Sequence, residues 1–199
     1  QGFQGNIQFM LILQKGSDAD NGIEADNDGD NHDAMPRSNP TLANLTMIGS
    51  EAGSHGMVFR RGSYVNIKNA LVTGFPRFGL DIRDEAGGAA IMNGEMSITT
   101  SLFFNNGDDG AADDLAGTEE GEDDDDNSFN EAEYFADSTQ ANQIGVDPIL
   151  TGFIPVSDSP VVEAGLMSAD DFFVATDYIG AFDPNGADWT EGWTSFETK

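Results

Sequence analysis

The acidic residues between Asp18 and Asp33 form a dense group of oxygen ligands. Carboxylate and amide oxygens suit calcium, which takes about six to eight oxygen ligands, better than they suit a transition metal. The candidate calcium ligands are Asp18, Asp20, Glu24, Asp26, Asp28, Asp30 and Asp33, with amide oxygens available from Asn21, Asn27 and Asn31. The segment is not an EF-hand, because a loop that starts at Asp26 has Asn31 at the glycine position and Arg37 at the position of the bidentate glutamate. A solvated acidic loop is the alternative.

A second possible oxygen site consists of Asp183, Asn185 and Asp188. Aspartate and asparagine next to proline and glycine are also the residues that ordinary turns require. We therefore favour a turn over a metal site here.

The charge of the chain limits its partners. Asp and Glu number 36 against 8 Lys and Arg, which gives a net charge of −28. Such a surface disfavours nucleic acid and anionic lipid and favours cations and cationic partners. The sequence contains no cysteine, which excludes disulfides and thiolate metal sites. The longest apolar run, Phe9 to Leu13, is far shorter than the roughly 20 residues of a transmembrane helix, so we expect no membrane span.

Short strand patterns recur along the first half of the chain. Asn44–Gly49 aligns with Asn69–Gly74, 25 residues later, and Gly56–Arg60 aligns with Gly79–Arg83, 23 residues later. A period of this length without intervening helices is typical of the coils of a β-solenoid. An earlier coil would contain the strand Ile7–Gln14 followed by Gly22–Asp26. A later one would contain Met96–Asn105.

Stacking these coils predicts which side chains share a column. Because side chains alternate along a strand, the apolar positions should point inward and their neighbours outward. The inward columns are Ile23, Met57 and Leu80, and Ala25, Phe59 and Ile82. The outward columns are Glu24, Val58 and Asp81, and Asp26, Arg60 and Arg83. Asn44 and Asn69 should stack at a turn, where amides can bond along the coil axis.

The chain divides into three parts by composition. Residues 1–107 should form the coils, 108–133 an acidic loop insertion, and 134–199 the last coil and a C-terminal capping segment. The acidic loop holds thirteen Asp and Glu without any Lys or Arg, which predicts an extended conformation. A short helical turn is expected within 128–135. The C-terminal segment is rich in aromatic residues and should cover the last coil: Phe172, Phe173, Tyr178, Phe182, Trp189, Trp193 and Phe196.

Five segments carry a resemblance to a known superfamily: Asn21–Asn27, Pro36–Thr41, Arg60–Gly62, Asp177–Phe182 and Trp189–Thr194. With them the chain resembles the pectate-lyase-like right-handed β-helices, and most of all the secreted or lipoprotein-type bacterial members of unassigned activity. The resemblance implies an all-β, right-handed parallel β-helix at the cell surface or outer membrane. Such proteins usually have further coils on the N-terminal side, which predicts that residues precede Gln1.

Polysaccharide lyases of this superfamily combine acidic calcium ligands with a basic residue that removes a proton beside a uronate carboxylate. Arg60, Arg61 and Arg83 lie near Asp26 and Asp81 in the expected stack and resemble that combination. Contacts between Asp26 and Arg60 would neutralise it, however, and a charge of −28 repels a polyanionic substrate. Among the many acidic residues, no pair stands out for hydrolysis.

The sequence therefore favours a non-catalytic extracellular or cell-surface scaffold, with calcium ordering its acidic turns. Its partner would be a protein, another copy in a surface assembly, or a glycan, and not nucleic acid. A carbohydrate-active enzyme, either a polysaccharide lyase or a glycoside hydrolase, is the alternative.

Overall fold

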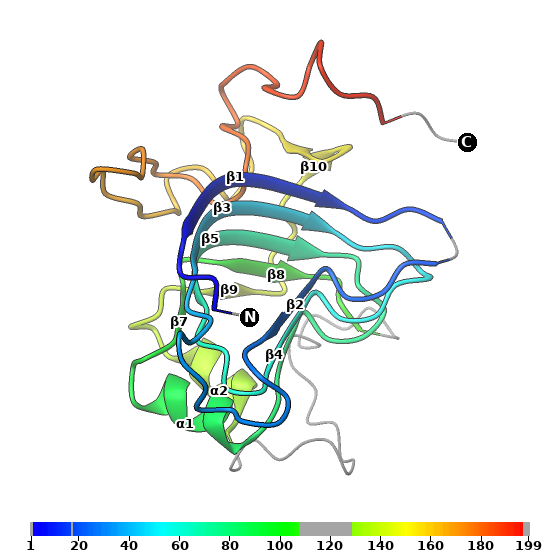
Figure 1. Cartoon of the computed structure of the whole chain (residues 1–199). Coiled ribbons are helices and arrows are strands. Elements are labelled where there is room, and N and C mark those ends of the chain that lie inside the picture. The colour runs from blue at the N-terminus through cyan, green and yellow to red at the C-terminus, as the bar shows by residue number, and fades with distance from the viewer. Residues whose placement is uncertain (1, 17, 108–128, 197–199) are drawn as a thin grey trace.

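Two parallel β-sheets form the framework of the structure, a computed structural model that describes residues 2–16, 18–107 and 129–196 (Figure 1). The large sheet contains β1 (Asn6–Leu13), β3 (Thr41–Ile48), β5 (Asn66–Thr73), β7 (Ser97–Thr99), β8 (Leu102–Phe104) and β9 (Gln143–Ile144). The small sheet contains β2 (Ile23–Asp26), β4 (Met57–Arg60) and β6 (Leu80–Ile82). The other elements are the helices α1 (Glu85–Met92) and α2 (Glu131–Ala136) and the antiparallel pair β10 (Leu150–Thr151) and β11 (Ile154–Pro155).

Each of the first three coils gives one strand to each sheet, and the register between coils is the one that the sequence predicts. In the small sheet, Ile23 pairs with Met57 and Met57 with Leu80. The large sheet follows the same rule, with Leu45 opposite Ala70. The expected earlier and later coils are present as β1 with β2, and as β7 with β8. The predicted arrangement of stacked parallel strands is therefore confirmed.

The inward columns form one continuous core between the sheets. Met57, Phe59, Leu80 and Ile82 are fully buried and pack with apolar residues of β3 and β5. Glycine recurs at the start of the small-sheet strands because the coils approach closely there. A Cβ on Gly56 would lie 2.5 Å from the carbonyl oxygen of Gly79, so only glycine fits without a shift of the backbone.

Each coil has one residue with a left-handed backbone at the same place in the large sheet. It lies within β1, β3 and β5, between β7 and β8, and just before β9. Phe9, Asn44, Asn69, Thr100 and Ala141 have φ of 62°, 54°, 54°, 48° and 53°. The flanking pairs place them on successive coils, since Gln8 lies opposite Ala43 and Ala43 opposite Lys68. The predicted stacking of Asn44 and Asn69 at a bend is thus confirmed.

The amides of this stack bond to the C-terminal segment as well as along the coil axis. Asn44 Nδ2 donates to the carbonyl oxygens of Tyr178 and Gly180. The Thr176 hydroxyl donates to Asn44 Oδ1 and accepts a hydrogen bond from Asn69 Nδ2. Asn44 and Asn69 are therefore linked along the coil axis through the hydroxyl group of Thr176, which comes from the C-terminal segment.

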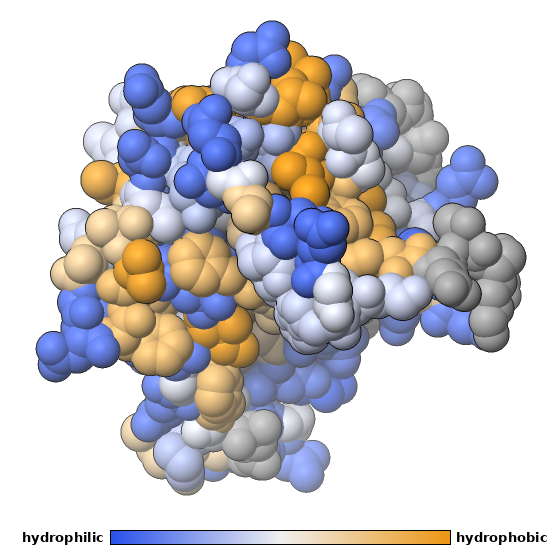
Figure 2. All heavy atoms as spheres, turned by 90° about the horizontal axis from the view of Figure 1, so that it is seen from above, coloured by the Kyte–Doolittle hydropathy of each residue, from blue (hydrophilic) through white to orange (hydrophobic). Residues whose placement is uncertain are grey.

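The C-terminal segment lies along the outer side of the large sheet, and its role as a cap over the last coil stays a prediction. Val161 and Ile179 pack there against Leu71 and Leu102, and the segment reaches the first coil through two hydrogen bonds between Gln8 and Val174. Leu71 on β5 and Leu102 on β8 are apolar side chains on this outer side and need a cover. Seen from above, the surface of the molecule shows apolar groups among hydrophilic ones (Figure 2).

Helix α2 packs against β6 and β8. The Phe135 ring packs against Phe103 with 4.8 Å between ring centroids, and the buried Glu131 carboxylate accepts the backbone N–H of Ile82 at 3.1 Å. The helical turn expected within 128–135 is thus found as α2. Most of the predicted acidic loop, residues 108–128, lies outside the described residues, so the three-part division stays a prediction.

Helix α1 is an element that the solenoid pattern did not predict. It follows β6 and begins after Asp84, whose side chain accepts the backbone N–H of Gly87 at 2.9 Å. Neither α1 nor α2, the helices of the described part of the chain, is long and apolar enough to cross a membrane.

We predict that Phe59→Ala lowers the free energy of unfolding by about 3–5 kcal/mol, because it leaves a cavity in the shared core. Val174→Ala, at a side chain 59% exposed, is the control and should cost less than about 0.5 kcal/mol. Urea denaturation monitored by circular dichroism measures both. Similar losses in the two variants would contradict the inward position of the Phe59 column.

Candidate functional site

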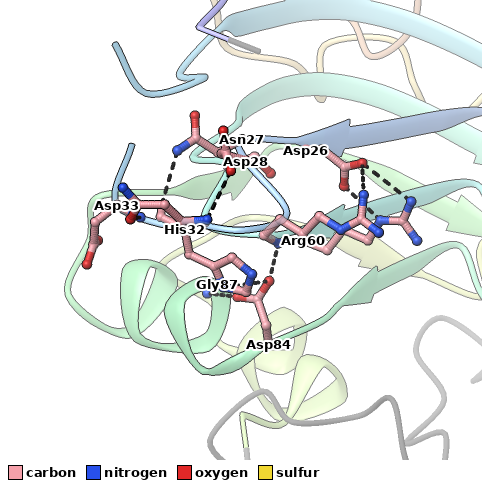
Figure 3. Close-up of polar contacts among 12 residues, drawn as sticks. Asp26, Asn27, Asp28, His32, Asp33, Arg60, Asp84 and Gly87 are labelled. Atoms are coloured by element: carbon pink, nitrogen blue, oxygen red, sulfur yellow. Dashed lines mark hydrogen bonds and ion pairs between the residues drawn. The ribbon is translucent and has the colours of Figure 1, made fainter. Parts of the chain in front are cut away.

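The outer face of the small sheet carries a network of carboxylates and arginines. Asp26 on β2 lies opposite Arg60 on β4, and Arg60 Nε is 2.7 Å from Asp26 Oδ1. Arg60 also pairs with Glu24 through Nη2. Arg61, the next residue, places Nη1 3.0 Å from Asp26 Oδ2. Two guanidinium groups therefore share the carboxylate of Asp26 (Figure 3).

This pairing holds the proton on Arg60. The hydrogen bond to Asp26 is the main cause that raises the pKa of Arg60, against an opposing effect of burial. A general base must give up its proton near the working pH, so a raised pKa is the reverse of what proton abstraction requires. The geometry favours a structural role for Arg60.

A second cluster on the same face is buried. Asp81 on β6 accepts a hydrogen bond from Arg83 Nε at 2.7 Å, and its Oδ2 lies 3.5 Å from His55 Nε2. His55 is 2% exposed and Asp81 5%. Asn21 Oδ1 accepts the backbone N–H of His55 at 3.1 Å and lies 3.1 Å from its Nδ1. The cluster thus joins the loops before β2 and β4 to β6.

These positions correct one expectation. The outward columns of the small sheet were expected to face solvent, but Val58 is fully buried and Asp81 nearly so. His55 lies in a polar, glycine-rich loop and is nevertheless buried, packing near the Phe78 ring. Alternation along a strand predicts the side to which a residue points but not whether another segment covers that side.

A hollow of about 490 Å³ lies beside the start of α1 and has mainly acidic walls. Asp84, with a φ of 72°, accepts the backbone N–H groups of Arg61 and Gly87. His32 Nδ1 lies 3.9 Å from Asp84 Oδ2. Asp33, Glu85 and Glu95 add three more carboxylates to the lining. Figure 3 shows His32 beside Asp84 and the loop that carries it.

The buried amide of Asn27 holds this loop in place. Its Nδ2 donates to the carbonyl oxygens of His32 and Ala34, at 3.1 and 3.0 Å, and its Oδ1 accepts the backbone N–H of Ser38. This candidate calcium ligand therefore has a structural role already.

The other candidate calcium ligands are spread over β2 and the loops on either side of it. Glu24 and Asp26 are held by Arg60, and Asp33 Oδ1 is 2.7 Å from Arg37 Nη2. Asp28 Oδ1 accepts the backbone N–H groups of Asp30 and Asn31, while Asp18, Asp20 and Asp30 are exposed. Within residues 2–16, 18–107 and 129–196, no three Asp, Glu or His side chains converge as metal ligands. Calcium binding stays a prediction.

The second candidate oxygen site makes the contacts of ordinary turns. Asp183 Oδ1 accepts the backbone N–H of Asn185 at 2.8 Å. Asp188 Oδ1 accepts the N–H of Thr190 at 2.8 Å and its hydroxyl at 2.6 Å. These bonds match the turn that we favoured from the sequence.

Comparison with known proteins gives one finding. Residues 1–150 match the family model described as a pectate-lyase like beta helix domain. The chain matches no curated protein and no solved structure.

We predict a coupling of about 0.5–1 kcal/mol between Asp26 and Arg60, because the pair is partly exposed and screened by water. The single variants Asp26→Asn and Arg60→Gln and the double variant form the cycle, read from urea unfolding. The coupling should shrink in about 1 M NaCl, where the Debye length is about 3 Å. A coupling that is absent at low salt would refute the pairing.

Proposed function

Because the chain belongs to the pectate-lyase-like β-helix family, we propose that it is a non-catalytic extracellular or cell-surface β-helix module, a scaffold for binding. In this proposal the two parallel sheets are faces of a right-handed solenoid. Such a solenoid offers long side faces to a partner.

The observation that carries the proposal is how the charged residues of the small-sheet face are paired. The carboxylate of Asp26 is shared by two arginines, Asp81 is bonded to Arg83, and Asp84 caps a helix. Catalytic acids and bases need a pKa near the working pH and access to substrate. The charged groups of this face are instead engaged with one another or with the backbone, both between coils, as at Asp26, and within a coil, as at Asp81 and Asp84, which supports a rigid scaffold.

The proposed partner is a protein, a second copy of the chain in a surface assembly, or a glycan. A net charge of −28 supports a partner with basic groups or a neutral one, and it argues against nucleic acid. The proposed location, secreted or associated with the outer membrane of a bacterium, rests on the resemblance to exported β-helix proteins.

Polysaccharide cleavage is the second candidate function, and the buried cluster of His55, Asp81 and Arg83 favours it. A histidine 3.5 Å from a carboxylate is an arrangement that can move a proton in enzymes. Its burial is the argument against this reading, since a glycan would need the cover to move before it could reach these side chains.

Incubation with uronate-containing and neutral polysaccharides separates the two functions. We expect neither unsaturated uronides, followed by their ultraviolet absorbance, nor new reducing ends. Cleavage that is lost in both His55→Gln and Asp81→Asn, while their circular dichroism spectra keep the native form, would make the protein an enzyme and overturn the scaffold proposal.

We further propose that calcium stabilises the acidic segment from Asp18 to Asp33. Three of its carboxylates are held by arginines, so calcium has to compete with them and we expect a small rise in the melting temperature Tm. Magnesium at equal ionic strength is the control, because it prefers a stricter geometry with shorter bonds. Equal shifts in Tm with calcium and magnesium would mean that the ions only screen the charges of the segment, and would contradict a calcium site.

A further inference from the structure

A groove of about 470 Å³ lies on the outer side of the large sheet, over the first halves of its strands. Its floor includes Thr41 on β3, Lys68 on β5 and Thr99 on β7. Lys68 and Thr99 lie directly opposite each other on neighbouring strands. The floor therefore presents hydroxyl groups around a single ammonium group.

The opposite wall is formed by residues 166–173 and is fixed to the sheet. The backbone N–H of Leu166 donates to Asn69 Oδ1 at 2.9 Å. The buried Phe173 packs with Met167 against Ala43, and Met167 forms an antiparallel bridge with Thr176. A wall held at three places keeps the groove open before a ligand arrives, which lowers the entropy cost of binding.

Lys68 differs from the other basic residues of the described chain. Arg37, Arg60, Arg61 and Arg83 each pair with a carboxylate. Lys68 is half-buried and makes no hydrogen bond or ion pair within residues 2–16, 18–107 and 129–196.

The charged group that faces Lys68 is Asp170 on the wall. Asp170 Oδ1 accepts the N–H groups of Phe172 and Phe173, both at 2.7 Å, and these bonds are the main cause that lowers the pKa of Asp170, with Lys68 a lesser one. Asp170 is therefore ionised at neutral pH and competes for Lys68.

We propose that this groove binds a small hydroxylated organic anion. The anionic group would lie at Lys68, the hydroxyl groups would bond to Thr41 and Thr99, and the carbon skeleton would pack on Leu166 and Met167. An ammonium group bonded to an anion gives a stronger hydrogen bond than a neutral donor does. The site lies on a different sheet from the arginine network and does not depend on the function proposed above.

The net charge of the protein does not exclude an anion here. The Debye length is about 8 Å at 0.15 M ionic strength, so carboxylates farther away than this are largely screened. The local balance between Lys68 and Asp170 then decides the affinity, and changing either residue should move it in opposite directions.

Titration of the isotope-labelled full chain, followed by NMR at constant ionic strength, tests the proposal with three probes. Gluconate carries both a charge and hydroxyl groups, acetate only the charge, and glucitol only the hydroxyls. Gluconate should shift the signals of Lys68, Thr41 and Thr99 with a Kd on the order of 1 mM. Acetate and glucitol should bind about tenfold more weakly, since each loses one class of contact.

Two variants and a control complete the test. Lys68→Gln should weaken gluconate binding about tenfold through loss of the charged donor. Asp170→Asn, which keeps an oxygen for the two backbone N–H groups, should tighten it. Lys15→Gln is the control, because Lys15 donates to the Phe196 carbonyl oxygen outside the groove, and it should leave the Kd unchanged. Failure of gluconate to give saturable shifts, or equal effects of Lys68→Gln and Lys15→Gln, would overturn the proposal.

Discussion

Parallel pairing in register between successive coils is the interaction on which the rest of the structure depends. A strand of one coil bonds to the same part of the next, so like positions stack: Met57 lies between Ile23 and Leu80. The same rule extends to the backbone, because a bend in one strand must recur in its neighbour. Asn44 and Asn69 share this bend with φ of 54° each. Asparagine tolerates the left-handed region better than most residues. Phe9 adopts the same backbone conformation because it lies beside Asn44 on the neighbouring strand β3.

Register also determines where the charges lie. Aspartate opposite arginine, as in Asp26 and Arg60, turns stacking into ion pairs between coils. A one-residue slip of either strand would point the charge of that strand into the core. The outer face of the large sheet is stabilised in another way, by apolar packing. Its outer side is apolar at Leu71 and Leu102, and the C-terminal segment covers those residues. The two sheets thus differ in what stabilises their outer faces, ion pairs on one and a packed segment on the other.

The features that repeat from coil to coil can be predicted from the sequence, whereas those that occur in a single coil were missed. The columns of Ile23 and Ala25 follow from the alternation of side chains, and the positions of Asn44 and Asn69 follow from the spacing. Helix α1 has no counterpart in the first two coils, which the structure describes except for Gln1 and Ser17, although Asp84 before an alanine- and glycine-rich run is a usable helix start signal. The burial of Asp81 depends on segments distant in sequence, and no local pattern encodes it. Helix α2 was expected as a short helical turn, but its contacts with Phe103 through Phe135 and with Ile82 through Glu131 join residues that are distant in sequence.

The same distinction applies to the candidate sites. We predicted calcium in the acidic segment from the types of its residues alone. A carboxylate can bind a cation readily only if it is not already paired with a donor of the protein. Glu24 and Asp26 form ion pairs with Arg60, and Asp28 accepts hydrogen bonds from backbone N–H groups. The Lys68 groove carries no sequence signal of its own, because a single lysine among threonines is unremarkable until the fold brings residues 166–173 over it. In a chain with this much negative charge, the informative residues are the few basic ones, and the informative question about each is which group it contacts.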